Sequence, residues 1–507
     1  MRLPFQSSAS RDFPVTAKAL VPWIVCGIFV VYLAASALPV LSGNGFDVTA
    51  FGRLPVLANG RVQPFDSVAR TTLLQIRGPV TPLIDGLKAP PARPAMIDPT
   101  VWLLEVLAKP DTADTRRIFP IKSRELLGKL QLAPGRGTNY YAFNDLGAKS
   151  SEIQKQHAQI PNTKASDRAQ WQEELIALRE KLMLYERLKN SLAPNSRLQQ
   201  DAKGKPVTFD FAGELAKYQV DLAEALRVDA GRRSGSNERL DVPTEMRIRT
   251  FSALFQFVSR MGVLSMVPRS NSPGSSKDWS NIGSLLVKSA LGHQPPPAIA
   301  FFAGMSSAFA QGKADAFNSQ LDQYRQWLAA NGHAPELRKD RFETFSNLLL
   351  PLVRAAALYA VALLLLGVAW STRSATAYRS ALMMVLLAST LHVTGLVFAT
   401  ILAGTPSWIA FLGWTIGLTA GLTALVVERF RRNGYGTLAS AAIGLASLVA
   451  AYAVTPGGAA SLLRNLLETS LVVAIGATVF VLAAGRESRT ARRSATAPQA
   501  ALESPIA

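Results

Sequence analysis

Long apolar runs occupy both ends of the chain, and a polar, charged stretch separates them. The first run covers residues 19–41. Five further runs cover residues 348–370, 381–403, 406–427, 437–455 and 467–485. A run of about 20 apolar residues is long enough to cross a bilayer as an α-helix. The pattern predicts a mainly α-helical integral membrane protein, with one N-terminal transmembrane helix and a five-helix transmembrane bundle over residues 348–485.

The polar stretch, residues 42–347, is expected to fold in water as a largely helical domain. It holds all but five of the 35 acidic residues. Within residues 166–193, apolar side chains recur at alternating spacings of four and three, which is typical of an amphipathic helix. Residues 210–227 and 250–264 follow a similar pattern, and residues 268–278 have the Ser, Pro, Asn and Gly content of a loop.

Basic residues predict the orientation of the spans. Arginines fall in alternate gaps of the C-terminal bundle, and bases also precede the first run, as the positive-inside rule describes. We therefore expect both termini in the cytoplasm: residues 1–18, and a tail of residues 486–507 that we expect to be disordered. The large domain is then exoplasmic, in the periplasm of a bacterium whose inner membrane holds the spans. A cleaved signal peptide is the rival interpretation of the first run, which is long for one.

Composition narrows the function classes. The formal net charge is +19, but no nucleic-acid-binding motif accompanies it, so the expected partner is the lipid bilayer and not nucleic acid. A basic domain beside a membrane is also suited to anionic headgroups or an anionic ligand. The only cysteine, Cys26, lies in the first apolar run. This excludes a CxxC redox motif and a CxxCH haem attachment site, so the chain is neither a thiol–disulfide carrier nor a c-type cytochrome.

One segment of the domain, LPVLANGRVQPFDSVAR at residues 54–70, carries a specific pattern. Asn59-Gly60 predicts a two-residue hairpin turn, because both central residues of such a turn need positive φ. Pro64 cannot continue a central strand. Asp66 or Ser67 is expected to cap a following helix. On spacing alone, the segment is a stiff collar that joins the first span to the domain.

The same segment resembles the G-R-x-K-P-x-D-T-x-A-R motif of the CcsA-like family, the membrane subunits of the ResB–CcsA (system II) machinery of cytochrome c maturation. The matching residues are Gly60, Arg61, Pro64, Asp66, Ala69 and Arg70, with Gln63 in place of the Lys and Ser67 in place of the Thr. The role of Gly60, Arg61, Pro64, Asp66 and Arg70 is left open.

The likeness resumes in the apolar runs. Three stretches are similar to the family's successive membrane segments. They are ETFSNLLLPLVRAAALY, LHVTGLVFATILAG and FLGWTIGLTAGLTALVVERFRRNGYG. Ala399 stands where the family has an Arg, and the loop after it is shortened to GTPSW. The family's Trp-rich haem-handling segment is missing. The resemblance implies a shortened member that assists haem delivery or complex assembly and is not a complete haem lyase by itself.

His392 is the candidate site within the membrane, because it is the only histidine within a predicted span. Ionisable groups inside a bilayer are rare and often functional. The family's membrane histidines imply a haem axial ligand here. The alternative is a structural histidine that hydrogen-bonds to Ser389, Thr394 or Thr400. A second ligand would come from another chain, such as a ResB-like subunit or a Trp-rich haem-handling protein.

No other catalytic or metal site is predicted. His157, His293 and His333 lie in the domain without ligand spacing, the first in a polar run and the others in loop contexts. We expect Trp408 and Trp414 to anchor the membrane interface and Arg354 to snorkel towards it.

Two function hypotheses follow. The first is a membrane component of c-type cytochrome biogenesis with a possible haem cofactor. The second is a membrane-anchored scaffold or sensor whose exoplasmic domain binds a protein or envelope component, with no haem role.

Overall fold

The computed structural model describes residues 17–37, 45–78, 97–133, 139–160, 164–194, 209–268, 279–291, 294–402, 408–431 and 435–454. The described chain is mainly helical, as predicted. Contacts divide it into two compact units. Unit 1 comprises Met1–Pro39 and Phe345–Ala507, and unit 2 comprises Val40–Thr344.

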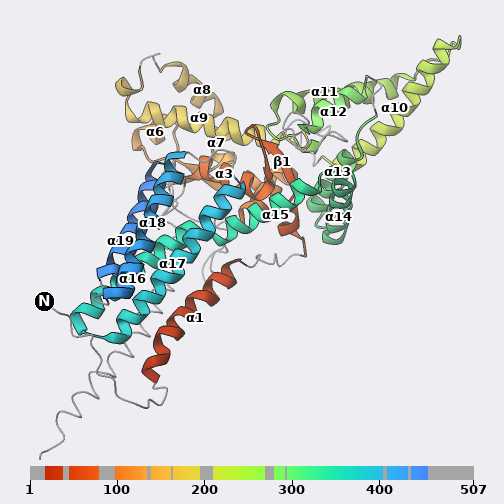
Figure 1. Cartoon of the computed structure of the whole chain (residues 1–507). Coiled ribbons are helices and arrows are strands. Elements are labelled where there is room, and N and C mark those ends of the chain that lie inside the picture. Colours follow the sequence, from red (N-terminus) through yellow and green to blue (C-terminus); the bar gives the residue numbers. More distant parts are fainter. Residues whose placement is uncertain are drawn as a thin grey trace, which may run out of the picture. The chain divides into compact units, whose positions relative to one another are not determined.

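Unit 1 is a bundle of apolar helices (Figure 1). Its helices are α1 (Ala17–Ala37), α16 (Pro351–Thr372), α17 (Ala375–Leu402), α18 (Trp408–Arg431) and α19 (Tyr435–Val454). α16 packs against α17 and α19, α18 pairs with α19, and α1 lies against α17. The expected run 467–485 lies outside the described residues.

Three helical ranges of the described chain are long and apolar enough to cross a membrane: Ala334–Thr372, Ala375–Leu402 and Phe411–Phe430. The apolar part of the first range is α16. Two shorter apolar helical ranges are Leu20–Ala35 in α1 and Tyr435–Val449 in α19.

Small residues let the bundle helices approach closely. A Cβ atom added at Gly444 would lie 2.5 Å from the ring of Tyr359, so α19 can pack on α16 only with glycine there. Such small-residue contacts are typical of helix pairs in membranes. A polar contact also joins the bundle helices. The buried carboxylate of Glu428 accepts hydrogen bonds from the Tyr378 hydroxyl, at 2.7 Å, and the Gly436 amide, at 2.8 Å. Glu428 therefore joins α17, α18 and α19 through satisfied polar contacts.

Unit 2 consists of helices and three small antiparallel hairpins. Its helices are α2 (Val48–Gly52), α3 (Phe65–Arg77), α4 (Pro99–Ala108), α5 (Pro110–Ala113), α6 (Arg124–Lys129), α7 (Phe143–Gly147), α8 (Ser150–Ala158), η1 (Ala165–Asp167), α9 (Gln170–Lys189), α10 (Phe211–Arg233), α11 (Val242–Met261), α12 (Ile282–Ser289), α13 (Pro297–Gln311), α14 (Ala314–Ala330) and the part of α15 (Ala334–Leu349) that ends at Thr344. Its strands are β1 (Pro55–Ala58), β2 (Arg61–Pro64), β3 (Arg117–Pro120), β4 (Tyr140–Ala142), β5 (Val267–Pro268) and β6 (Trp279–Ser280).

The hairpin prediction is confirmed. β1 and β2 pair in antiparallel register, with Ala58 opposite Arg61. Asn59 and Gly60 occupy the turn with φ of 51° and 76°, as a two-residue turn with two positive φ angles requires. The predicted cap is wrong, because Pro64 is the N-cap of α3 and makes no side-chain cap bond. The pyrrolidine ring presets the backbone there, which leaves the side chains after it free for other contacts.

The apolar stripe of α9 is buried as predicted. Leu175, Leu178 and Tyr185 are almost fully inaccessible. At the end of this stripe Lys189 is also buried, and its ammonium lies 2.8 Å and 2.9 Å from the two carboxylate oxygens of Asp114. The Tyr185 hydroxyl donates to the same carboxylate at 3.0 Å. A buried charge is tolerated here because its partner and hydrogen bonds are complete.

Replacing Lys189 with methionine should lower the free energy of unfolding of unit 2 by about 3–5 kcal/mol, because the buried Asp114 carboxylate would lose the ammonium that balances its charge. Chemical denaturation of the full chain in detergent, followed by tryptophan fluorescence, measures the loss. The second change Asp114→Leu should recover most of it. Lys217→Met, in an exposed pair with Glu214, is the control and should show no measurable change. Equal stability of Lys189→Met and the control would contradict the prediction.

Candidate functional site

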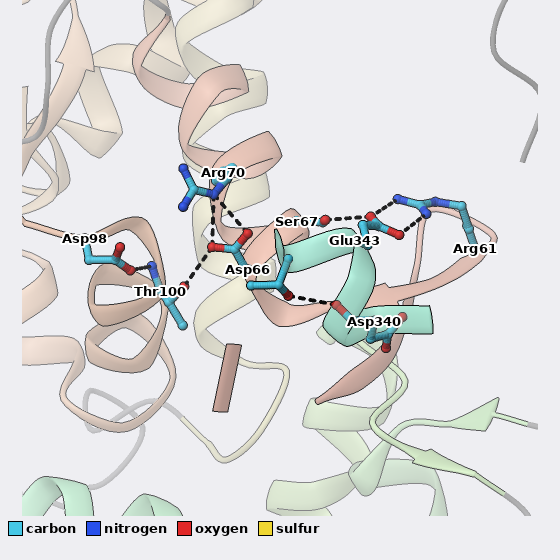
Figure 2. Close-up of polar contacts among 9 residues, drawn as sticks. Arg61, Asp66, Ser67, Arg70, Asp98, Thr100, Asp340 and Glu343 are labelled. Atoms are coloured by element: carbon cyan, nitrogen blue, oxygen red, sulfur yellow. Dashed lines mark hydrogen bonds and ion pairs between the residues drawn. The ribbon is translucent and has the colours of Figure 1, made fainter. Parts of the chain in front are cut away.

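The residues of the GRVQPFDSVAR segment lie together at the β1–β2 hairpin and the first turns of α3 (Figure 2). Arg61, at the start of β2, makes a two-pronged ion pair with Glu343 of α15. Its Nη1 lies 2.7 Å from one carboxylate oxygen and its Nη2 2.8 Å from the other. Nη2 also donates to the Gln63 amide oxygen at 2.7 Å. The hydrogen bonds to Glu343 raise the pKa of the Arg61 guanidinium.

Ser67 completes this contact from α3. Its hydroxyl donates to the Glu343 carboxylate at 2.6 Å. Glu343 is buried and therefore holds the hairpin, the start of α3 and α15 together through one carboxylate. These elements lie 276 to 282 positions apart in the sequence. The motif thus joins elements near the start of unit 2 to the helix at its end.

A second ion pair lies within α3. Arg70 Nε donates to both carboxylate oxygens of the buried Asp66 at 2.9 Å, one helical turn along. Thr100, near the start of α4, contacts the same carboxylate at 3.4 Å, and its amide donates to the α4 N-cap residue Asp98 at 2.8 Å. Asp66 lies in the first turn of α3, where the helix dipole favours a negative charge. The contacts of this carboxylate therefore bring α3 and α4 together.

Gly60 and Pro64 shape the backbone, whereas Arg61, Asp66 and Arg70 make ion pairs. Each charged residue of the motif thus has a structural partner in unit 2. These contacts give the segment a structural role within unit 2, and its role in joining the first span to the domain stays a prediction. None of these side chains presents a free nucleophile or base.

Asp340, one turn before Glu343 on α15, differs from the charged residues around it. It is completely buried, and neither carboxylate oxygen has a hydrogen-bond partner among the described residues. Its carboxylate is directed away from that of Glu343 (Figure 2). Burial raises the pKa of the Asp340 carboxyl to about 8, and the nearby negative charge of Glu343 adds to the rise. Asp340 therefore holds a proton at neutral pH.

The domain histidines form no common site among the described residues. His157 lies on α8, with Nε2 3.3 Å from Arg179 Nη1. His333 lies between α14 and α15 and is buried against Trp279, with 6.0 Å between the ring centroids. His293 lies outside the described residues. The described chain holds no cluster of three or more His, Cys, Asp or Glu side chains that would hold a metal ion.

His392 lies on α17 inside unit 1 and is completely buried. Its ring makes an edge contact with Tyr359 of α16 at a centroid distance of 6.1 Å. The backbone of Trp414 on α18 lies nearby. Neither ring nitrogen has a hydrogen-bond partner of ordinary geometry among the described residues.

The three hydroxyls expected to satisfy His392 are bonded elsewhere. The Ser389 hydroxyl lies 3.1 Å from that of Tyr359. Thr394 and Thr400 donate to backbone carbonyls one turn back along α17, at 2.8 Å each. The structural alternative for His392 is therefore wrong in the partners it named.

One expectation about the bundle is wrong. Trp414 does not face outwards as an anchor but is buried in the core of unit 1, whereas the side chain of Trp408 lies outside the described residues. The snorkelling of Arg354 stays a prediction. The Arg354 side chain is buried, its Nη2 donates to the Leu348 carbonyl at 3.2 Å, and its guanidinium lies 5.4 Å from the Tyr32 ring centroid. The carbonyl and the aromatic face give the guanidinium partners within unit 1.

Glu343 and Asp340 were not predicted from the sequence as site residues. The available signal was their spacing with Glu336, which places three acids on neighbouring positions of one helix. The burial of that surface depends on the hairpin, which lies far away in the sequence.

Neither the protein-family models nor the curated proteins give a match to this sequence. The resemblance to the CcsA-like family rests on the residues quoted above and stays a prediction.

Arg61→Ala should destabilise unit 2, because Glu343 would remain buried with only the Ser67 hydroxyl as partner. Adding Glu343→Gln should recover part of the loss, with a coupling energy of about 1–3 kcal/mol between the two sites. Chemical denaturation of the four proteins of the cycle measures this coupling. Arg70→Ala, which breaks the pair with Asp66, is the matched control and should not be rescued by Glu343→Gln. Additive losses for Arg61 and Glu343 would contradict the shared contact.

Asp340→Asn should change the pH dependence of stability. The carboxyl titrates at its ordinary value of 3.8 in the unfolded chain and at about 8 in the fold. The folded state therefore holds a proton that the unfolded state has released between these values. Its contribution is fully present below about pH 4 and is lost as pH rises to about 8, at up to about 1.4 kcal/mol per pH unit.

Thermal unfolding of the full chain from pH 5 to 9 tests this prediction. The variant has no carboxyl to ionise, so its stability relative to the wild type should rise with pH and level off above about pH 8. Glu180→Gln, at an exposed position of α9, should track the wild type. A constant difference between Asp340→Asn and the wild type would show that Asp340 titrates normally.

Proposed function

We propose that this protein is a membrane component of c-type cytochrome biogenesis that assists haem delivery or assembly of the haem-ligation complex. The observation that carries the proposal is His392, a buried imidazole whose two ring nitrogens make no hydrogen bond of ordinary geometry to the described bundle helices, with only the Trp414 backbone nearby. An unsatisfied polar group inside an apolar bundle costs free energy, so its retention favours a role in binding. The resemblance of the membrane segments to the CcsA-like family supports the same function.

The proposed topology has six spans, one at the N-terminus and five in the C-terminal bundle. Both termini lie in the cytoplasm and the domain of residues 42–347 lies in the periplasm. The alternation of arginines in the gaps supports this orientation.

The donor chemistry at His392 suits haem, whose iron commonly takes an imidazole nitrogen as an axial ligand. Because neither nitrogen makes a hydrogen bond of ordinary geometry to a described residue, the imidazole is available for this bond. The ring is fully buried, so a porphyrin would displace side chains that now pack on it, of which Tyr359 is one. A partner subunit, ResB-like or a Trp-rich haem-handling protein, would supply the second ligand. His392 would hold the group, and the chain would support ligation carried out by its partners.

Absorption spectroscopy tests haem binding directly. The full chain, purified in detergent together with co-expressed system II subunits, should show a Soret band. His392→Ala should lose that band, because no other imidazole lies in the predicted spans. His157→Ala, in unit 2, is the matched control and should keep it. Absence of haem from the wild-type protein, even with the partner subunits present, would refute the proposal.

A scaffold or sensor role remains the second candidate, and one observation favours it. The helices α10 and α11 run side by side in unit 2 (Figure 1) and leave apolar side chains in solvent. Val220 is 71% exposed and Val242 is 70% exposed. Near them a groove of about 320 Å³ is lined in part by Tyr218, Met246 and Phe251. Exposed apolar patches of this kind often mark protein-binding surfaces.

Deletion of the gene separates the two candidates. Loss of covalently bound haem from c-type cytochromes, measured by haem staining of membrane proteins, is the expected result. Normal cytochromes together with an envelope defect would favour the scaffold and contradict the role in biogenesis.

A further inference from the structure

Unit 2 contains a cavity of about 350 Å³ that is separate from the motif contacts. It lies where the end of α2 meets α14 and α15. Three arginines line it, one from each element: Arg53 at the C-cap of α2, Arg325 on α14 and Arg341 on α15. The remaining lining residues are Asp322, Gln326, Ala329 and Leu337.

The charges of the cavity do not balance. Asp322 is its only acidic lining residue, and it pairs with Arg325 at 3.1 Å. The Asp322 side chain is 62% exposed, so this pair is well solvated and weak. Arg53 and Arg341 have no ion pair with a described carboxylate. The cavity therefore holds an excess of two positive charges.

Arg53 is held in this place by the fold. Its backbone amide donates to the carbonyls of Thr49 and Ala50 at 3.2 Å, which fixes the end of α2. Its Nε is buried and has no hydrogen-bond partner among the described residues. Burial lowers the pKa of the Arg53 guanidinium and the positive charge of Arg341 lowers it further, whereas the negative charge of Asp47 opposes them in part. The buried Nε of Arg53 without an acceptor and the repulsion between Arg53 and Arg341 are two separate costs that a bound anion would reduce.

We propose that Arg53, Arg325 and Arg341 form a binding site for the phosphate group of a small molecule or lipid headgroup. Each guanidinium is a planar, fork-shaped donor that can make two parallel hydrogen bonds to two oxygens of an oxyanion. Three forks carried by different elements suit a tetrahedral phosphate, with several oxygens, better than a planar carboxylate with two. The volume leaves room for a small substituent on the phosphate, and Ala329 and Leu337 offer it an apolar wall.

The site is independent of the proposed haem function. It uses none of the motif residues, and its arginines belong to unit 2, whereas His392 belongs to unit 1. The site also gives three of the basic residues of the domain a specific role.

Binding of glycerol 3-phosphate to the full-length protein in detergent, measured by titration calorimetry and thermal shift at low ionic strength, tests the proposal. The ligand should raise the unfolding temperature, whereas sodium acetate at equal ionic strength should have little effect. Arg53→Gln and Arg341→Gln should each weaken binding about tenfold or more, because each removes a charge-assisted fork. Arg53→Lys should fall between Arg53→Gln and the wild type, since it keeps the charge and loses the fork.

Arg249→Gln is the matched control, since this arginine is exposed on α11 in a pair with Glu245. It should bind glycerol 3-phosphate like the wild type. Arg53→Gln and Arg341→Gln should fold without ligand, because each removes one of two charges that repel each other. If Arg53→Gln nevertheless fails to fold, glycerol 3-phosphate binding by Arg341→Gln tests the proposal, since Arg341 is exposed. Coincident binding curves for the wild type and Arg341→Gln, or an equal response to acetate, would overturn the proposal.

A second arm identifies the source of the phosphate. The same titration is repeated in nanodiscs of phosphatidylcholine and in nanodiscs that contain phosphatidylglycerol. If the wild type binds glycerol 3-phosphate more weakly in nanodiscs that contain phosphatidylglycerol than in nanodiscs of phosphatidylcholine, a lipid headgroup occupies the site. Equal affinity in both lipids, still lost in Arg341→Gln, identifies a soluble phosphate compound. Equal affinity of the wild type and Arg341→Gln in both lipids would overturn the proposal here too.

Discussion

The ion pair between Arg61 and Glu343 is the contact on which the organisation of unit 2 depends. It joins the hairpin near the start of the unit to the helix at its end, 282 positions later. A two-pronged arginine–carboxylate contact fixes orientation as well as distance, because both partners are planar. The Asn59-Gly60 turn sets the direction of Arg61, and Ser67 adds a third hydrogen bond to the same carboxylate. A collar built in this way holds its shape because no member can move without breaking a charged contact.

Helix α15 carries different chemistry on its two sides. Asp340 and Glu343 are buried towards the hairpin and α3, and only Glu343 has polar partners there. Leu337 and Arg341, one turn apart, line the arginine cavity with α14 and Arg53. The spacing of about 3.6 residues per turn separates these sets around a single helix. The helix therefore carries, on one side, a buried acid without a hydrogen-bond partner among the described residues and, on the other, the Arg341 cation.

Buried polar groups in the apolar bundle of unit 1 are satisfied to different extents at different positions. Glu428 is buried but satisfied by Tyr378 and Gly436, and Arg354 is buried but bonded to a carbonyl beside an aromatic ring. His392 lacks such partners, although hydroxyls lie on its own helix. In helices, threonine hydroxyls bond readily to the carbonyl one turn back, which removes them from competition for the imidazole. His392 shares this lack of a described partner with the buried hydroxyls of Ser380, Thr437 and Ser440, but it is the only one of these four that carries an imidazole.

The sequence by itself determined the features that depend on local periodicity and backbone chemistry. Apolar runs, the stripe of α9 and the Asn59-Gly60 turn follow from residue spacing and from the φ angles that glycine and asparagine tolerate. Only the tertiary structure decided which distant side chains meet. Glu343 became the partner of Arg61, Trp414 became a core residue, and three arginines came to share a cavity, because burial and charge pairing depend on elements far apart in the chain. A hydrophobic pattern records which side of a helix is buried, but it contains no information about what covers that side.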